Sequence, residues 1–158
     1  MGFDTPAGTR GARTRSSAGP FGHWMQRRMM NYHRRAGWKF LGMEVLFLTT
    51  VGRRTGAERT TAVSWFPYGD GTWLIVASAA GAAQHPAWYK NLAAHPDQLS
   101  IELADGRHEV IAEQLSSPSR EQIWLRIIAA QPRYAKYQNK TDRELPVIHL
   151  MPRGPAVR

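Results

Sequence analysis

Residues 43–67 read MEVLFLTTVGRRTGAERTTAVSWFP, and they carry the clearest structural pattern of the chain. A nearly continuous apolar run over residues 43–51 predicts one strand. Residues 59–67 alternate more regularly and predict a second strand, with Thr61, Val63 and Trp65 on one side. Two glycines bracket the connection, and glycine allows the backbone to turn tightly. The stretch therefore predicts a pair of strands joined by a glycine-bracketed loop.

That loop is strongly basic. Arg53, Arg54 and Arg59 lie beside Thr55 and Gly56 within a few residues. Guanidinium groups offer a planar fork of donors that suits phosphate and carboxylate. The loop can be a cradle for an anionic ligand or a solvated loop whose charges aid solubility. It is not a Walker phosphate-binding loop, because three residues rather than four separate the glycines and no Lys-Ser/Thr pair follows.

The segments after this loop also contain strands connected by short turns, which is typical of antiparallel sheets. Turn residues at 68–71 precede a third strand, and turn residues 105–106 lie between two more. Ser117 and Ser119 are candidate caps of a late helix. The predicted strands cover residues 43–51, 59–67, 72–78, 99–103, 108–115 and 146–151, and the predicted helices cover residues 21–37, 87–95 and a segment that opens at 117–121. This order predicts a mainly β, α+β fold, namely an antiparallel sheet or small barrel with flanking helices.

Composition sets the domain plan. The chain has 158 residues, a net charge of +9 and no cysteine, which excludes disulfides and thiolate metal sites. We expect a disordered basic tail over residues 1–20, an amphipathic helix over 21–40, a single β-barrel domain over 41–152 and a short tail over 153–158. The helix can lie on an acidic membrane surface or cover one end of a barrel. The sequence shows no apolar span and no signal peptide, so a cytoplasmic location is the expectation.

Two further segments carry candidate chemistry. Small residues at 77–83 would let a flat ligand approach the backbone, and the helix at 87–95 adds Trp88 and Tyr89 near that position. Later, Tyr134 and Tyr137 share a helical face, and their phenols could donate a hydrogen bond or a proton. On pattern alone, a plain loop with a core tryptophan and two half-buried tyrosines that pin a helix are the simpler interpretations. The histidines have no spacing typical of a metal site.

Taken together, these segments resemble one family, the deazaflavin (F420)-dependent nitroreductases of actinobacteria, also called F420H2-dependent quinone reductases. The resemblance runs from about residue 40 to 151 and rests on three motifs in order. They are LTTVGRRTGAER at 48–59, Ala-Ser at 77–78 followed by a small-residue loop, and PAWYKNL at 86–92, with a late YAKYQNKTDRELP at 134–146. The chain departs from the family where Ala79 and Ala80 replace a common Lys and Gly.

The resemblance implies a split β-barrel of the flavin-reductase type and coenzyme F420, a deazaflavin with a phosphate and an oligoglutamate tail. FMN is the second candidate cofactor. By residue matching, the tail and phosphate would be held by the basic loop, the ring would lie beside the small-residue loop, and the substrate would face the late tyrosines. The implied cofactor residues are Arg53, Arg54, Thr55, Gly56, Arg59, Ala77, Ser78, Ala79, Trp88, Tyr89 and Asn91, and the implied catalytic residues are Tyr134 and Tyr137.

The function implied is an oxidoreductase that passes a hydride from reduced F420 to a quinone, an activated enone or a nitroaromatic compound. The alternative is a carrier that binds F420, a flavin or a lipid in the same barrel without turnover. A nucleic-acid-binding module is a third possibility, supported only by charge. The expected partners are a small-molecule hydride acceptor and peripheral membrane contact through the basic N-terminal segment. The expected assembly is a monomer or a homodimer.

Overall fold

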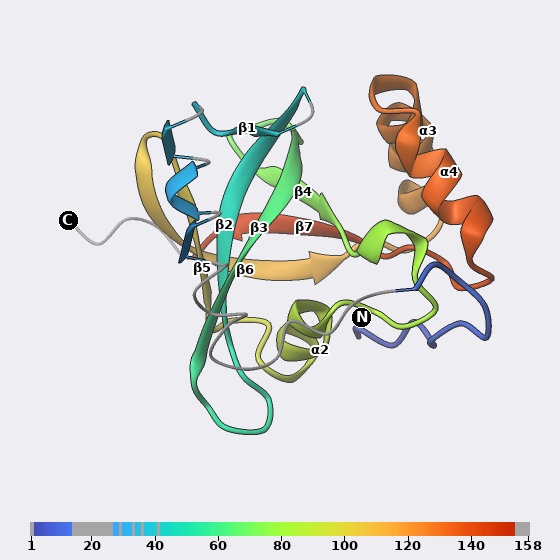
Figure 1. The fold of residues 1–158 in the computed structure, drawn as a ribbon, viewed down its shortest axis with the longest axis horizontal. Coiled ribbons are helices and arrows are strands. Elements are labelled where there is room, and N and C mark those ends of the chain that lie inside the picture. Colours follow the sequence, from blue (N-terminus) through green and yellow to red (C-terminus); the bar gives the residue numbers. More distant parts are fainter. Residues whose placement is uncertain are drawn as a thin grey trace.

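A closed antiparallel barrel forms the centre of the computed structural model, which describes residues 2–13, 27–28, 30–32, 34–35, 37–40 and 42–153. The sheet has the order β1-β2-β3-β4-β7-β6-β5, and β2 also pairs with β5, so that six strands close into a barrel (Figure 1). The strands are β1 (Lys39–Phe40), β2 (Met43–Val51), β3 (Glu58–Pro67), β4 (Trp73–Val76), β5 (Leu99–Leu103), β6 (Gly106–Gln114) and β7 (Val147–Pro152). The predicted mainly β fold with flanking helices is confirmed.

The helices flank this barrel. They are the short 3-10 turn η1 (Ala79–Gly81) and the helices α2 (Ala87–Ala94), α3 (Ser119–Ala130) and α4 (Arg133–Lys140). Two predicted details are wrong. Neither Ser117 nor Ser119 caps α3, because Pro118 holds the N-cap position and the Ser117 hydroxyl donates to Glu121 at 2.7 Å. The strand predicted over 72–78 ends at Val76, because the chain then turns into η1.

The interior of the barrel is filled by aliphatic side chains from β2, β4, β5, β6 and β7. Leu46, Leu48, Ile75, Ile101, Val110, Ile148 and Leu150 are at most 1 % exposed. Leu92 of α2 joins the same cluster, so this helix closes one end of the barrel. Val63 and Trp65, predicted to share one side of their strand, both pack against this core.

Strand β2 is apolar on both faces because the segment that precedes it in the chain covers its outer face. Phe47, 1 % exposed, has its ring centroid 5.0 Å from that of Trp38, and the Arg34 guanidinium lies 5.2 Å from the Phe47 ring. Arg34 also forms an ion pair of 3.0 Å with Glu102 of β5. Residues 27–28, 30–32 and 34–35 of the predicted 21–40 helix are helical, and Arg34 places this described part against the barrel wall. The prediction is wrong at its C-terminal end, because Lys39–Phe40 form strand β1 and pair with β2. In that described part and elsewhere among the described residues, no helix is long and apolar enough to cross a bilayer.

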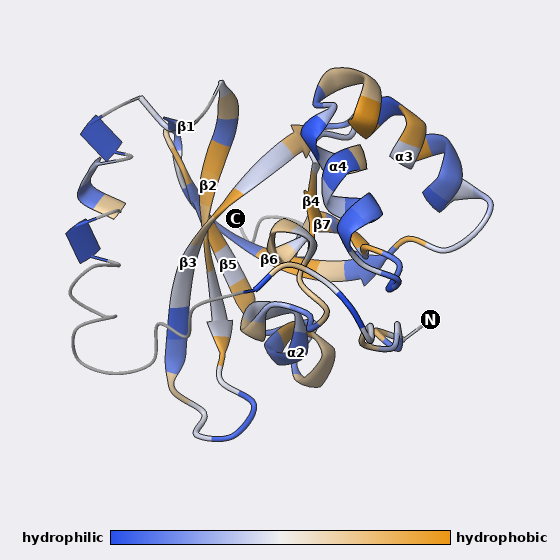
Figure 2. Cartoon of the chain, turned by 45° about the vertical axis from the view of Figure 1, so that its right-hand side comes forward, coloured by the Kyte–Doolittle hydropathy of each residue, from blue (hydrophilic) through white to orange (hydrophobic). Residues whose placement is uncertain are grey.

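A second apolar cluster fixes α3 and α4 against the other side of β4 and β7. Ile123 and Ile127 of α3 meet Leu74 and Val147 here, and Tyr134 of α4 is buried among them. Figure 2 shows α4 as mainly hydrophilic. The position of α4 therefore depends on few apolar anchors, of which Tyr134 is the largest.

The N-terminal segment over residues 2–13 differs from its prediction. Instead of being disordered, it lies along η1 and the end of α4. The Gly8 amide donates to the Ala83 carbonyl at 2.8 Å, and the Ala12 amide donates to the Gly81 carbonyl at 2.9 Å. The sequence does not indicate these contacts because they are made by backbone groups, which residues of every type carry. Residues 14–20, and residues 154–158 of the predicted C-terminal tail, lie outside the described residues.

Asp142 anchors this segment and makes it sensitive to acid. Its carboxylate accepts hydrogen bonds from the Thr9 hydroxyl, the Thr9 amide at 2.7 Å and the Arg10 amide at 3.2 Å. These bonds, the Thr9 hydroxyl first, lower the pKa of Asp142 from 3.8 to about 2. A lowered folded-state pKa means that the unfolded chain binds the proton more tightly. The stabilisation is therefore present above pH 3.8 and is lost as the pH falls through about 2.

We expect Asp142→Asn to lower the free energy of unfolding at neutral pH, because the amide replaces a charged acceptor. The difference from the wild type should shrink as the pH falls from about 4 to about 2. Denaturant titrations at a series of pH values measure it. Asp70→Asn is the control, because Asp70 lies in the β3–β4 turn at φ 52°, where asparagine is well tolerated. A difference that is constant with pH would contradict the assignment.

Candidate cofactor site

The β2–β3 loop is a compact turn that presents its arginines to solvent. The Gly52 amide donates to the Ala57 carbonyl and the Gly56 amide donates to the Gly52 carbonyl, both at 2.8 Å. Gly56 has φ 72°, a left-handed conformation that favours glycine. The predicted anion-binding residues Arg53, Arg54, Thr55, Gly56 and Arg59 are all exposed. In Figure 2 the hydrophilic loop extends beyond the barrel.

Asn91 of α2 fixes this loop to the barrel. It is only 4 % exposed, its side-chain amide donates to the Thr50 hydroxyl at 3.1 Å, and its carbonyl oxygen accepts the Arg53 amide at 3.2 Å. Because the buried Asn91 side chain hydrogen-bonds to both Thr50 and Arg53, it orients the start of the loop. Asn91, predicted as a cofactor residue, therefore supports the loop from beneath. Thr50, its partner, was missed because a threonine in a strand gives no sequence signal.

The loop that follows β4 has an unusual backbone. Ser78 has right-handed helical angles, whereas Ala79 (φ 44°) and Ala80 (φ 53°) are left-handed. This order of angles brings successive N–H groups to one side and makes a concavity for anions or carbonyl oxygens. Among the described residues, the amides of Ser78, Ala79 and Ala80 donate to no acceptor. The predicted ring-binding positions thus carry backbone donors that are not used within the fold.

The carbonyls of the same loop are bound by a buried arginine that the sequence analysis did not select. Arg143 is 3 % exposed and donates to the carbonyls of Ala77, Ser78 and Ala82 at 2.7–2.9 Å. One of its terminal nitrogens also lies 3.1 Å from His85 Nδ1. Sequence gives no sign that an arginine is buried, although the Thr-Asp-Arg segment belongs to the late motif.

Trp88 and Tyr89 of α2 lie in different surroundings. Trp88 is half-buried against the barrel core. Tyr89 is 3 % exposed, its hydroxyl donates to Gln114 at 2.7 Å, and its ring centroid lies 4.4 Å from that of His85. Tyr89 is therefore part of the packing under the N-terminal segment, and burial raises its pKa.

The two late tyrosines also differ in their burial and in their neighbours. Tyr134 is 5 % exposed and packs edge-on between Phe66 and Tyr137, with centroids 5.5 Å apart in each pair. Burial raises the pKa of Tyr134, so its phenol is a weaker acid than a free one. Tyr137 is half-buried, and its backbone carbonyl lies so close to Gly81 that a Cβ there would be 2.5 Å from the oxygen. Tyr137 therefore borders the 77–82 loop, whereas Tyr134 anchors α4.

The site residues form two groups, each of which is connected to α2. The β2–β3 loop is joined to the helix through Asn91, and the 77–82 loop leads into its first turn. No hydrogen bond joins the two loops directly among the described residues. Two clefts of about 370 and 310 Å³ lie along the N-terminal segment, and neither is lined by the basic loop or the late tyrosines.

Known proteins share this fold and much of this sequence. A family model described as F420H(2)-dependent quinone reductase matches residues 23–152. An F420H(2)-dependent quinone reductase of Mycobacterium tuberculosis is 37 % identical over 108 residues, which cover 66 % of this chain and 71 % of the relative.

Solved structures agree. A structure described as an F420-H2 dependent reductase (FDR-A) has a TM-score of 0.60 and 33 % identity, covering 68 % of this chain and 93 % of the other. A second, described as a domain-swapped dimer, has a TM-score of 0.61 and 28 % identity, covering 82 % of this chain and 98 % of the other. A heme storage protein of Vibrio cholerae, 16 % identical at a TM-score of 0.52, covers 82 % of this chain and 92 % of its own, and shares the fold alone. The chain is a split-barrel oxidoreductase that belongs to the F420H2-dependent quinone reductase family.

Proposed function

We propose that this chain is an F420H2-dependent reductase that passes a hydride to a quinone. The observation that carries the proposal is the exposed group of three arginines on a loop fixed to α2, in a chain of the quinone reductase family. Arginines without a protein carboxylate partner are suited to a ligand that brings its own negative charges. No ion pair among the described residues includes Arg53, Arg54 or Arg59.

The donor chemistry fits F420 at both of its ends. Arg53, Arg54 and Arg59, with Thr55 and the Gly56 backbone, would hold the phosphate and the glutamate tail. The amides of Ser78, Ala79 and Ala80, which donate to no acceptor among the described residues, would bind polar oxygen or nitrogen atoms of the ring, with Ala77, Ser78 and Ala79 beside it. Trp88 would give one wall of the ring site, while Tyr89 and Asn91 support it from within the fold.

When bound, the reduced deazaflavin supplies a hydride from its C5 position. A quinone that takes this hydride together with one proton becomes the hydroquinone. The chain's part is to orient both molecules, exclude water and deliver that proton. Of the two predicted catalytic tyrosines, the half-buried Tyr137 is the better proton donor, because Tyr134 has the raised pKa and the fuller burial. The family name of the relatives supports a quinone over an enone or a nitroaromatic acceptor.

We test the proposal by titrating the protein with oxidised F420 and following fluorescence, then by adding menadione to the protein with reduced F420. We expect saturable binding and oxidation of the reduced cofactor at a rate that rises with protein concentration. Binding without turnover would identify a carrier instead, and no saturable binding would overturn the proposal. The domain-swapped dimer among the related structures supports a homodimer, which light scattering during gel filtration would measure.

A further inference from the structure

Arg143 is a buried cation whose partners are almost all backbone carbonyls. Its Nε donates to Ala82 O at 2.7 Å, Nη1 donates to Ala77 O at 2.9 Å, and Nη2 donates to Ser78 O at 2.7 Å. No ion pair among the described residues includes it, and both neighbouring carboxylates are engaged elsewhere, Asp142 with Thr9 and Glu144 with Arg120. Burying a guanidinium without a carboxylate is costly, so its use here indicates a function beyond packing.

The three carbonyls that Arg143 binds belong to the loop with two left-handed alanines. Alanine is strained at positive φ, and such a backbone persists only where its surroundings hold it. The Arg143 guanidinium binds the carbonyls of Ala77 and Ser78. These bonds fix the peptide planes that join residue 77 to 78 and residue 78 to 79. The amides of Ser78, Ala79 and Ala80 are the donors left without an acceptor among the described residues.

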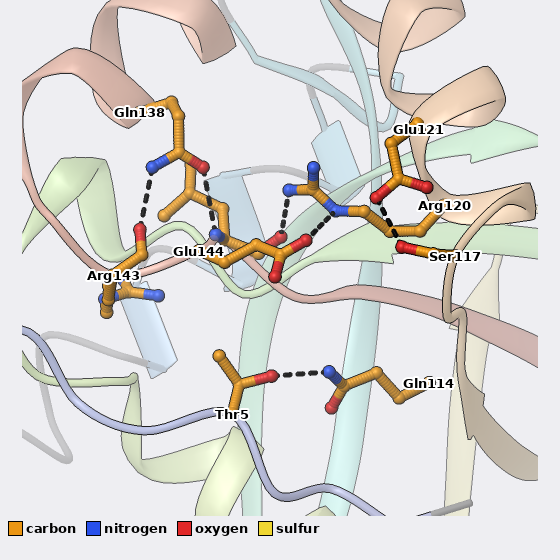
Figure 3. A network of polar contacts seen from close by, with 9 residues as sticks. Thr5, Gln114, Ser117, Arg120, Glu121, Gln138, Arg143 and Glu144 are labelled. Atoms are coloured by element: carbon orange, nitrogen blue, oxygen red, sulfur yellow. Dashed lines mark hydrogen bonds and ion pairs between the residues drawn. The ribbon is translucent and has the colours of Figure 1, made fainter.

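Arg143 is itself held in place at its guanidinium and at its backbone. His85 Nδ1 lies 3.1 Å from Arg143 Nη1 and can only accept from it, so the ring proton lies on Nε2, which donates to the Thr5 carbonyl at 2.7 Å. On the other side, the Gln138 amide donates to the Arg143 carbonyl at 2.7 Å and accepts the Leu145 amide at 3.0 Å (Figure 3). Arg143 is thus fixed at its side chain and at its backbone.

We propose that Arg143 is a positioning residue that keeps the 77–82 loop in the shape that presents its amides to the cofactor ring. The inference rests on the proposed function and extends it to a residue that does not itself touch the ligand. It predicts that Arg143 acts on cofactor affinity more than on overall stability.

Arg120 offers a matched control. It is also buried, at 9 % exposure, and it also donates to a backbone carbonyl, that of Leu145, at 2.8 Å (Figure 3). It binds none of the 77–82 carbonyls, and its guanidinium lies 4.7 Å from the Trp124 ring and pairs with Glu144. Replacing either arginine by lysine removes a buried guanidinium group and keeps the positive charge. Only Arg143→Lys also removes the hydrogen bonds that hold the 77–82 loop.

The experiment compares Arg143→Lys with Arg120→Lys by F420 titration, chemical denaturation and steady-state kinetics. We expect Arg143→Lys to weaken F420 binding by about tenfold or more and to raise KM for reduced F420, because a small misplacement of binding groups is costly. Arg120→Lys should bind F420 within about twofold of the wild type. In both variants KM for menadione should change little. If the Arg143 variant does not fold, Arg143→Gln and Arg120→Gln replace the pair.

The outcomes separate the two proposals. If the wild type shows no saturable F420 binding, the proposed function falls, and with it the role of Arg143 toward this cofactor. If the wild type binds and the two lysine variants have equal affinity, the positioning role alone is overturned. Selective loss of affinity in Arg143→Lys, with changed amide NMR signals of Ser78–Ala80 in the cofactor-free protein, supports it.

Discussion

Replacing Arg53 and Arg54 together by alanine should weaken F420 binding by about a hundredfold and leave the fold intact. A hydrogen bond to a charged group contributes about 1.5–3 kcal/mol, and we take the lower end for exposed side chains, which corresponds to about tenfold for each arginine. Both side chains are exposed and neither contacts the core, so unfolding should be unchanged within about 0.5 kcal/mol. Fluorescence titration with F420 measures the loss.

The control for this variant carries the same change in charge at another place. Arg107→Ala with Arg126→Ala removes two exposed arginines from β6 and α3. If long-range attraction to a basic protein explained binding, both double variants would weaken it equally. A loss confined to the Arg53 and Arg54 variant indicates a local cradle, and equal losses would contradict it.

Removing the Tyr134 ring should have the largest effect on stability. Tyr134→Ala leaves a cavity where α4 meets Phe66 and Leu74, and truncating a large buried aromatic side chain costs about 3–5 kcal/mol. Tyr134→Phe keeps the ring and should cost far less. Chemical denaturation of both variants measures these free energies.

Phenylalanine variants of the two late tyrosines distinguish which phenol acts in the reaction. We expect Tyr134→Phe to turn over nearly as fast as the wild type, because its phenol is buried, whereas Tyr137→Phe should lower kcat. Steady-state assays with reduced F420 and menadione provide the comparison. A slower Tyr134→Phe beside an unchanged Tyr137→Phe would reverse the assignment.

The sequence predicted the individual strands because each strand carries its own local signal. The apolar run of β2, the alternation of β3 and the turns after Tyr68 and at Asp105 are local patterns, and the observed strands follow them closely. Closure through the β2–β5 pairing is a long-range contact with no local signal, and only the resemblance pointed to it.

Burial limits what the sequence indicates about the candidate site. Exposed arginines on a turn can be read from composition and glycine spacing, and the loop has the expected shape. Tyr134, Tyr89 and Asn91 carry polar groups that suggested ligand contact, yet each is buried and supports a neighbouring element. Arg143 shows the converse, since a charged residue is expected outside and this one holds a loop from within.

The most direct test of the account is a crystal structure of the protein with oxidised F420. We expect the phosphate and glutamate tail within hydrogen-bonding distance of Arg53, Arg54 or Arg59, and the ring against the amides of Ser78–Ala80. A ring bound elsewhere in the barrel, with the three guanidinium groups remaining in solvent, would contradict it.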